Sequence, residues 1–375
     1  MVKFMHISDT HLGSVQYSIP EREEDFYDVF REAMEIAKES EVDFIIHSGD
    51  LFDSPRPSNR ALRIAQEEMH DLEKRNIPVY SIVGDHDRPK LRDNPSHVLF
   101  DLFGMKMLGL DEFQSTLFKG SSEPVFIGGI GNLKSFRSDF LKEQYNRASL
   151  LAKDYKTSIF ISHQAIAPLF PTENSEANED DLPVNFNYLA FGHVHQFKQK
   201  KYGRSLFAYS GSTEVKSTNE IPSLSRKGKG VNIVTIEDEE TEIERKKLVQ
   251  VRAQYEIRGT SEEIISGIEK LTMDKYQKKP IISTTITEKT NRKEFMQKLK
   301  DYESLFIFRQ PLMDINAEGK SPDVSFDDTM PEVFAKYFDS KKKSELALEI
   351  YKSVRDRDAR REEILEICRE ILNDN

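Results

Sequence analysis

Three apolar segments in the N-terminal part of the chain run directly into ionisable side chains. They lie at residues 2–7, 42–47 and 79–83 and have the character of strands. The stretches between them, 21–39 and 58–75, carry apolar residues at helical spacing. The order strand, helix, strand, helix, strand is typical of a mostly parallel sheet with crossover helices. We therefore predict an α/β fold.

The pattern resets near residue 240, which predicts more than one domain. Up to that point we expect further strands at 125–129, 158–162, 188–191, 206–209 and 231–236. A second strand–helix–strand–helix–strand series follows, without a cluster of His, Cys or Asp, so we assign it no chemistry of its own. We expect a main domain, a small domain, a linker and a helical segment at 1–240, 241–316, 317–330 and 331–375.

The apolar faces of the helical segment are too small to form a core alone. They either pack back on the body or dock on a partner, and the acidic linker that precedes them favours docking.

Composition limits where function can reside. The net charge of −11 repels phosphate, so a nucleic-acid-binding surface would have to be a local basic patch. The single cysteine, Cys368, excludes an internal disulfide. Because the chain has no run of about 18 apolar residues either, we expect a cytoplasmic protein.

Aspartates and histidines follow the predicted strands throughout the main domain. Loops at the carboxyl edge of an α/β sheet place their side chains in a common crevice. Mixed Asp and His ligands suit manganese, iron or zinc. There are too many ligands for one open site, so they predict two metals bridged by one carboxylate, an arrangement suited to phosphoryl displacement. The residues are Asp9, His11, Asp50, Asp85, His86, His163, His193 and His195.

Taken one by one, most of these motifs are weak signals. A lone Asp-x-His is more often a capping Asp and a satisfied surface His, and Gly-Asp after a strand is ordinary turn chemistry. Gly192-His193-x-His195 is more specific, because residues i and i+2 of an extended segment point the same way. The decisive feature is that all the motifs occur in one chain, each at a strand end. His47, His70 and His97 lie outside this pattern, and we interpret them as structural.

In this order the motifs resemble the calcineurin-like metallophosphoesterase superfamily. The stretches at 6–13, 47–52, 56–57 and 209–214 are similar to the SbcD/Mre11-type DNA double-strand-break repair nucleases. The resemblance covers about residues 1–240, and the rest agrees only in layout. It implies a metallophosphoesterase β-sandwich flanked by helices, a small α/β DNA-capping domain and C-terminal helices. These helices would bind a coiled-coil ABC-type ATPase of the Rad50/SbcC type.

The resemblance also implies roles for the site residues. One metal would be held by Asp9, His11, Asp50 and His195, and the second would share Asp50 and add Asp85, His163 and His193. His86 would face the scissile phosphate and either protonate the leaving oxygen or stabilise developing charge. The family uses two Mn²⁺ ions and cuts DNA as a 3′-to-5′ exonuclease on duplexes and an endonuclease on single strands.

Position 85 departs from the family, which normally has Asn there. A carboxylate still ligates a metal but adds negative charge beside an anionic substrate. We expect reduced nuclease activity with metal binding retained.

Basic residues around the predicted site are candidates for phosphate contacts. They comprise Arg56, Arg60, Arg88, Lys90 and Arg92, followed by Lys198, Lys200, Lys201 and Arg204 after the last histidine motif. Members of the family form homodimers through the helices that here correspond to 58–75 and 96–103. Leu99, Phe100 and Phe103 could lie at that seam or could pack on the chain's own sheet.

Two alternatives to a nucleoid-associated, manganese-dependent DNA repair nuclease remain open from the sequence. One is a phosphodiesterase for small substrates, or a protein phosphatase, on the same fold. Either would leave the second domain and the detached helices without a role. The other is a catalytically weakened subunit that binds or scaffolds DNA ends, which Asp85 motivates.

Overall fold

The computed structural model describes residues 1–89, 94–170 and 175–314, with six further positions between 331 and 348. These residues form two compact units. Unit 1 comprises Met1–Tyr255, Lys275–Ile282 and Leu305–Arg309, and unit 2 comprises Glu256–Asp274, Ser283–Ser304 and the chain from Gln310 on. The predicted linker and most of the predicted C-terminal helical segment lie outside the described residues. Within the described ranges, no helix is long and apolar enough to cross a membrane.

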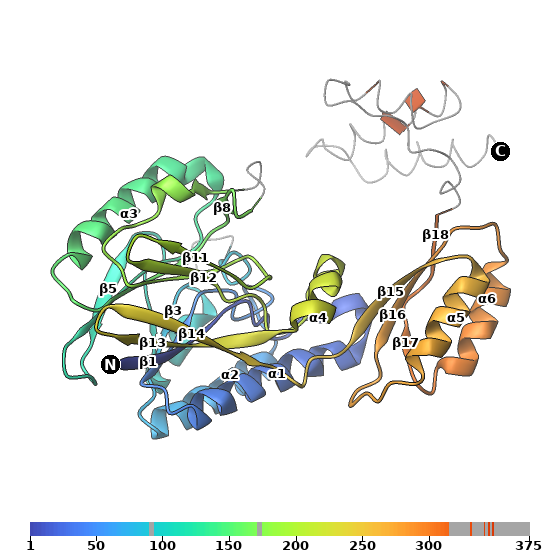
Figure 1. Ribbon diagram of the computed structural model, residues 1–375, viewed down its shortest axis with the longest axis horizontal. Helices are drawn as coiled ribbons and strands as arrows, with labels where there is room; N and C mark the ends of the chain where they lie inside the picture. Colours follow the sequence, from blue (N-terminus) through green and yellow to red (C-terminus); the bar gives the residue numbers. More distant parts are fainter. Residues whose placement is uncertain are drawn as a thin grey trace. The chain divides into compact units, whose positions relative to one another are not determined.

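The first sheet of unit 1 has the strand order β14-β13-β1-β2-β3-β4. Its four parallel strands are β1 (Val2–Ile7), β2 (Phe44–His47), β3 (Val79–Ser81) and β4 (Met105–Met107). The antiparallel strands β13 (Gly230–Glu237) and β14 (Glu240–Lys247) extend it beyond β1. Helices α1 (Pro20–Glu39) and α2 (Asn59–Lys74) lie along one face (Figure 1).

The second sheet has the order β11-β12-β10-β7-β6-β5. Its parallel strands are β6 (Val125–Ile130), β7 (Ser158–His163), β10 (Tyr188–Gly192) and β12 (Ser205–Tyr209). The edges are the antiparallel strands β5 (Gln114–Phe118) and β11 (Lys198–Tyr202). Helix α3 (Ser138–Ala152) lies against the outer face (Figure 1).

Alternating side chains of the strands divide the core of unit 1 into three layers. Met5 and Ile45 point toward α1 and α2, whereas their neighbours Phe4 and Phe44 point toward the second sheet. Phe4 and Phe44 stack with ring centroids 5.1 Å apart. They share one buried cluster with apolar residues of β6, β7, β10 and β12. The two sheets therefore pack face to face, and the predicted α/β sandwich flanked by helices is confirmed.

Unit 1 also contains several short elements. They are η1 (Gln16–Ser18), η2 (Ser96–Phe103), η3 (Ser135–Arg137), β8 (Ile166–Ala167), β9 (Ala177–Asn178), η5 (Glu179–Asp181), η6 (Thr218–Glu220) and α4 (Ile221–Lys227).

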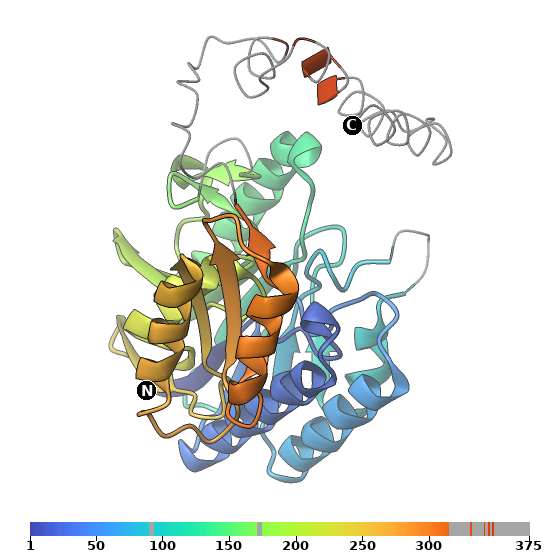
Figure 2. The same cartoon turned by 90° about the vertical axis from the view of Figure 1, so that its right-hand side faces the viewer.

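The C-terminal described part follows the predicted strand–helix–strand–helix–strand order. The elements are β15 (Gln254–Gly259), α5 (Ser261–Leu271), β16 (Ile281–Ile286), α6 (Arg292–Leu299), η7 (Lys300–Tyr302), β17 (Ile307–Phe308) and β18 (Leu312–Met313). Thr260 and Glu263 form the capping box that their spacing predicts at the start of α5. Helices α5 and α6 lie side by side (Figure 2). The boundary between the two compact units passes through this small sheet, and the predicted domain boundaries stay a prediction.

Candidate metal centre

Both sheets end at the same edge of unit 1, and this brings the predicted site residues together. In the first sheet, Ile7 pairs with His47, and His47 pairs with Ser81, so three loops leave at one level. In the second sheet, Gly192 pairs with His163. The eight predicted residues lie in or directly after these strands.

One group of potential ligand atoms comes from Asp9, His11 and His195, which lie within 4.8 Å of one another. The Nε2 atoms of His11 and His195 are only 3.2 Å apart. Asp9 Oδ1 lies 3.6 Å from His195 Nε2. Two imidazole nitrogens and a carboxylate oxygen thus converge on one point, as ligands of a single cation would.

A second group comes from Asp85, His163 and His193. Asp85 Oδ1 lies 3.3 Å from His163 Nε2 and 3.1 Å from His193 Nδ1. Asp50 stands between the two groups, since its Oδ2 is 3.7 Å from His11 Nε2 and 3.5 Å from His163 Nε2. This is the place that a carboxylate shared by two metals would occupy.

The backbone is held in an uncommon conformation at this edge. Asp9, His11, Asp50 and His193 have φ values of 52°, 44°, 55° and 83°. Non-glycine residues adopt this left-handed region only where the surrounding structure imposes it, often at functional sites. Gly84 makes room for the cluster, because a Cβ there would lie 2.0 Å from Asp50 Oδ1.

Hydrogen bonds behind the histidines set which ring nitrogen faces the cluster. His163 Nδ1 lies 2.7 Å from the carbonyl oxygen of Ser48, which only accepts, so Nδ1 carries the proton and Nε2 offers its lone pair to the cluster. His195 Nδ1 lies 2.9 Å from Glu220 Oε1, and His11 Nδ1 lies 3.3 Å from Asp53 Oδ1. Metal-binding histidines are oriented by such partners.

The electrostatics of the cluster fit divalent cations. Burial alone would raise the pKa of Asp50, but the adjacent His163 and His11 hold that pKa well below its ordinary value. Asp9 and Asp50 are both buried. They lie among the histidines of the two groups, which are His11, His163, His193 and His195. Buried carboxylates require counter-charges, and this oxygen and nitrogen donor set suits Mn²⁺, Fe²⁺ or Zn²⁺. The metal-binding roles stay predictions, which this geometry supports.

His86 lies beside the ligand groups with a different set of contacts. Its backbone N–H donates to Asp50 Oδ1 over 2.9 Å, and its ring meets the ring of His11 edge-on at 4.8 Å. Its Nδ1 donates to the carbonyl oxygen of Asp53 over 3.1 Å. The ring is half-exposed. With Nδ1 engaged, Nε2 is the nitrogen that can meet a substrate.

Comparisons with known proteins agree with this geometry. Residues 2–197 match the family model for calcineurin-like phosphoesterases. The DNA double-strand break repair protein Mre11 of Thermoplasma acidophilum is 39% identical over 94% of each chain. The chain therefore belongs to the calcineurin-like phosphoesterase family and, within it, to the Mre11 family. Proteins called Mre11 from Sulfurisphaera tokodaii (31% identity, 87% of this chain and 84% of the relative) and Methanococcus maripaludis (38%, 61% and 62%) are also similar.

Four residues that support the site in this phosphoesterase were missed from sequence. Asp53 contacts His11 and forms an ion pair with Lys216. Glu220 holds His195 and forms a buried ion pair with Lys229. Glu220 does have a local signal, since Ser217-x-x-Glu220 is a capping box. Its contact with a histidine 25 positions away exists only in the folded chain.

Asp53 also allows a third arrangement of ligands. Together with His11 and His86 it forms a further group whose potential ligand atoms lie within 4.8 Å. Its carboxylate is already paired with Lys216, however, and His86 Nδ1 is bonded to a carbonyl oxygen. Both contacts favour a role in positioning over a role in metal binding.

The predicted DNA-contacting cations of this Mre11-family chain differ in whether a carboxylate or a carbonyl oxygen of the chain already binds them. Arg56 is exposed. By contrast, Arg60 is paired with Glu24 and lies over the ring of Tyr27, and Arg88 is paired with Asp111. Lys198 donates to the carbonyl oxygen of Leu169, and Lys200 is paired with Glu179. Lys90 and Arg92 lie outside the described residues. All of these contacts with DNA stay predictions.

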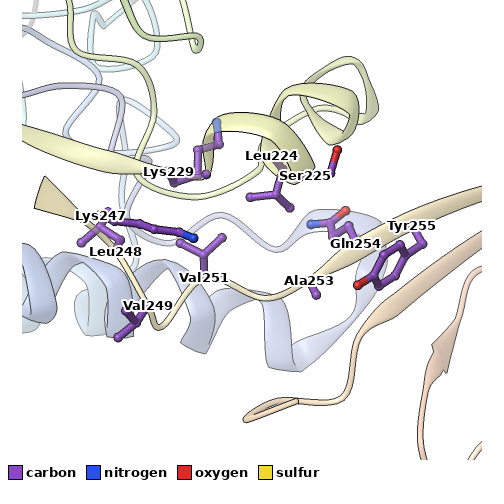
Figure 3. Close-up of a pocket in the computed structure, with 11 residues that line it drawn as sticks. Leu224, Ser225, Lys229, Lys247, Leu248, Val249, Val251, Ala253, Gln254 and Tyr255 are labelled. Carbon is purple, nitrogen blue, oxygen red and sulfur yellow. The ribbon is translucent and has the colours of Figure 1, made fainter. Parts of the chain in front are cut away.

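Figure 3 shows one cavity in the described part of this phosphoesterase. It has a volume of about 380 Å³ and lies between α4 and the segment 247–255. Leu224, Leu248 and Val251 supply much of its apolar wall, and Lys229 and Lys247 its charged one. No predicted ligand lines it, so the chemistry of the side chains, rather than cavity size, identifies the candidate site.

Proposed function

We propose that this chain is a manganese-dependent DNA nuclease subunit of a double-strand-break repair complex. It would act as a 3′-to-5′ exonuclease on duplex DNA and an endonuclease on single strands. The observation that carries the proposal is the pair of ligand groups joined by Asp50, in a chain that matches an Mre11 protein along nearly its whole length. We place its action in the cytoplasm, at the nucleoid.

Each of the two ligand groups would bind one metal ion. Asp9, His11 and His195 would hold one Mn²⁺, the second group would hold the other, and Asp50 would bridge them. When bound, the two cations would stabilise the charge that develops on the scissile phosphate. The chain's own contribution is to fix this geometry in advance. Ser48, Asp53 and Glu220 orient the rings, and the left-handed backbone fixes the carboxylates.

His86 is our candidate for a catalytic residue. Because its Nδ1–H is committed to the carbonyl oxygen of Asp53, any proton it gives to the substrate must come from Nε2. A protonated ring could transfer that proton to the leaving oxygen or stabilise negative charge there. Asp53, tied to Lys216 Nζ, would keep the ring at a constant angle.

We propose that Asp85 attenuates this activity. Burial raises its pKa, but hydrogen bonds with His163 and His193 hold the pKa far below its ordinary value, so the carboxylate stays ionised. The site would then hold metal firmly but present one more negative charge to the phosphate.

We further propose a homodimer and an ATPase partner. On η2, Leu99 and Leu102 are 55% and 82% exposed, and Val98 is also exposed. Phe100 is buried against Phe52 inside the chain's own core. The dimer seam would therefore use Val98, Leu99 and Leu102 and not Phe100. The coiled-coil ATPase of the Rad50/SbcC type would bind the predicted helices of 331–375.

A nuclease assay with labelled duplex and single strands tests the function. We expect cleavage that needs Mn²⁺ and stops with EDTA. Replacement His86→Ala should lower the rate by about 10² to 10⁴-fold with metal content retained. His70→Ala, which removes an exposed histidine of α2, is the matched control. Hydrolysis of bis(p-nitrophenyl) phosphate without cleavage of either DNA would contradict the proposal and favour a phosphodiesterase for small substrates.

A further inference from the structure

A second pocket of about 220 Å³ borders the candidate metal centre. Four cationic side chains line it, together with Phe197 and with His195, which is also a predicted metal ligand. We call it the cationic pocket, and its cations are Arg226, Lys227, Lys229 and Arg245. None of its lining residues is acidic. This is unusual in a chain whose net charge is −11.

Arg245 is the most informative of the four cations. Its guanidinium lies 4.3 Å from the centre of the Phe197 ring, and its Nη1 donates to Asn232 Oδ1 and to the carbonyl oxygen of Ser210 over 2.8 and 3.0 Å. Among the described residues, no carboxylate forms an ion pair with it. Burial lowers its pKa to about 10, so it is still charged at neutral pH. A partly buried cation without a counter-ion is costly, and a bound anion would offset that cost.

Of the other three cations, Lys229 is neutralised by a carboxylate, whereas Arg226 and Lys227 can bind an anion. Lys229 is buried and held by Glu220 and by Ser212 Oγ at 2.6 Å, so its charge is largely balanced. Arg226 and Lys227 are exposed at the end of α4. Burial and the positive charge of Lys227 together lower the pKa of Lys198, which shows that cations crowd this side of the site.

We propose that the cationic pocket binds a phosphate of the DNA strand adjacent to the scissile one. A guanidinium placed over an aromatic ring can still offer its remaining N–H groups to phosphate oxygens. Since His195 belongs to both the pocket and the ligand groups, a strand engaged at the metals would pass this wall. The inference rests on the proposed DNA substrate, because a small phosphodiester has no second phosphate to offer.

DNA binding by the full chain, measured in EDTA by fluorescence anisotropy with a labelled single strand, tests the pocket. The variant is Arg226→Gln/Lys227→Gln, which changes two exposed side chains. Lys119→Gln/Lys153→Gln removes the same charge from two exposed positions outside the pocket. We expect the pocket variant to bind on the order of tenfold more weakly at low salt, and its salt slope to fall by about 1.

The outcomes separate the two proposals. Equal affinities and slopes for the pocket variant and its control, with clear binding by the wild type, would overturn the cationic pocket alone. A wild-type chain with no affinity for DNA at low salt would contradict the proposed function itself. Unchanged thermal unfolding of both variants confirms that the comparison reports on the surface.

Discussion

His6 lies in the first sheet of unit 1 and His163 lies in the second. Ser48 contacts both of them. The hydroxyl of Ser48 bonds to His6 Nε2 over 2.8 Å, and its carbonyl oxygen bonds to His163 Nδ1 over 2.7 Å. The other nitrogen of His6 bonds to the Tyr188 hydroxyl. The other nitrogen of His163 faces the carboxylates of Asp50 and Asp85. Burial and then the charge of Arg245 lower the pKa of His6 to about 3, so it is neutral.

The difference shows what separates a structural histidine from a ligand in this fold. Both rings are buried, so burial does not distinguish them. Their positions differ, since His163 ends β7 whereas His6 lies inside β1. In His6 both nitrogens are bonded to hydroxyls. In His163 one nitrogen is fixed by a carbonyl, and the other is left for a cation.

Replacing each histidine by glutamine should have very different effects on hydrolysis. His163→Gln should lower hydrolysis of phosphodiesters by on the order of a thousandfold or more, because a ligand of the second group is lost. His6→Gln should keep the metal content of the wild type, with its effect confined to stability. Metal analysis and the nuclease rate of the folded fraction measure both, and equal losses in the two variants would refute the distinction.

The contacts behind the ligands can be tested in the same way. Glu220→Gln should weaken metal binding by about 10 to 100-fold, because His195 loses the carboxylate that orients it. Glu179→Gln also removes a carboxylate paired with a lysine but touches no histidine of the site, and it should leave metal affinity unchanged. Titration of each variant with Mn²⁺ checks this. If both variants bind metal as tightly as the wild type, Glu220 has no positioning role.

The charge of Asp85 provides a gain-of-function test. Asp85→Asn keeps an oxygen ligand between His163 and His193 and removes a negative charge next to the substrate. We expect DNA hydrolysis under saturating Mn²⁺ to rise by about tenfold, since one unit charge a few ångströms away is worth a kcal/mol or more. The rate on labelled duplex measures it, and no gain would end the attenuation hypothesis.

His6 should also have a signature in the pH dependence of stability. Its folded-state pKa of about 3 lies below the ordinary value of 6.5, so between these values the unfolded chain binds a proton that the folded chain does not. The free energy of unfolding should therefore fall as pH falls through this range, by about 1.4 kcal/mol per pH unit from this group. Urea unfolding should show a shallower slope for His6→Gln, and parallel slopes would contradict the assignment.

Hydrophobic periodicity predicted the α/β fold, and the resemblance to the phosphoesterases implied the sandwich. The polar motifs at strand ends singled out eight residues that the structure brings to one edge. It could not predict the supporting contacts. Glu220 and Lys229 meet His195 only through the fold. The strand β11 was hidden by its lysines, which suit an exposed edge strand. The burial of Phe100 depends on its contact with Phe52, which no local pattern contains.

Crystals soaked in Mn²⁺ and measured by anomalous scattering would show whether two metals share Asp50. We expect two peaks about 3.5–4 Å apart. One should lie among Asp9, His11 and His195, and the other among Asp85, His163 and His193, with Asp50 between them. A single peak, or a peak bound by His86 and Asp53, would contradict this arrangement.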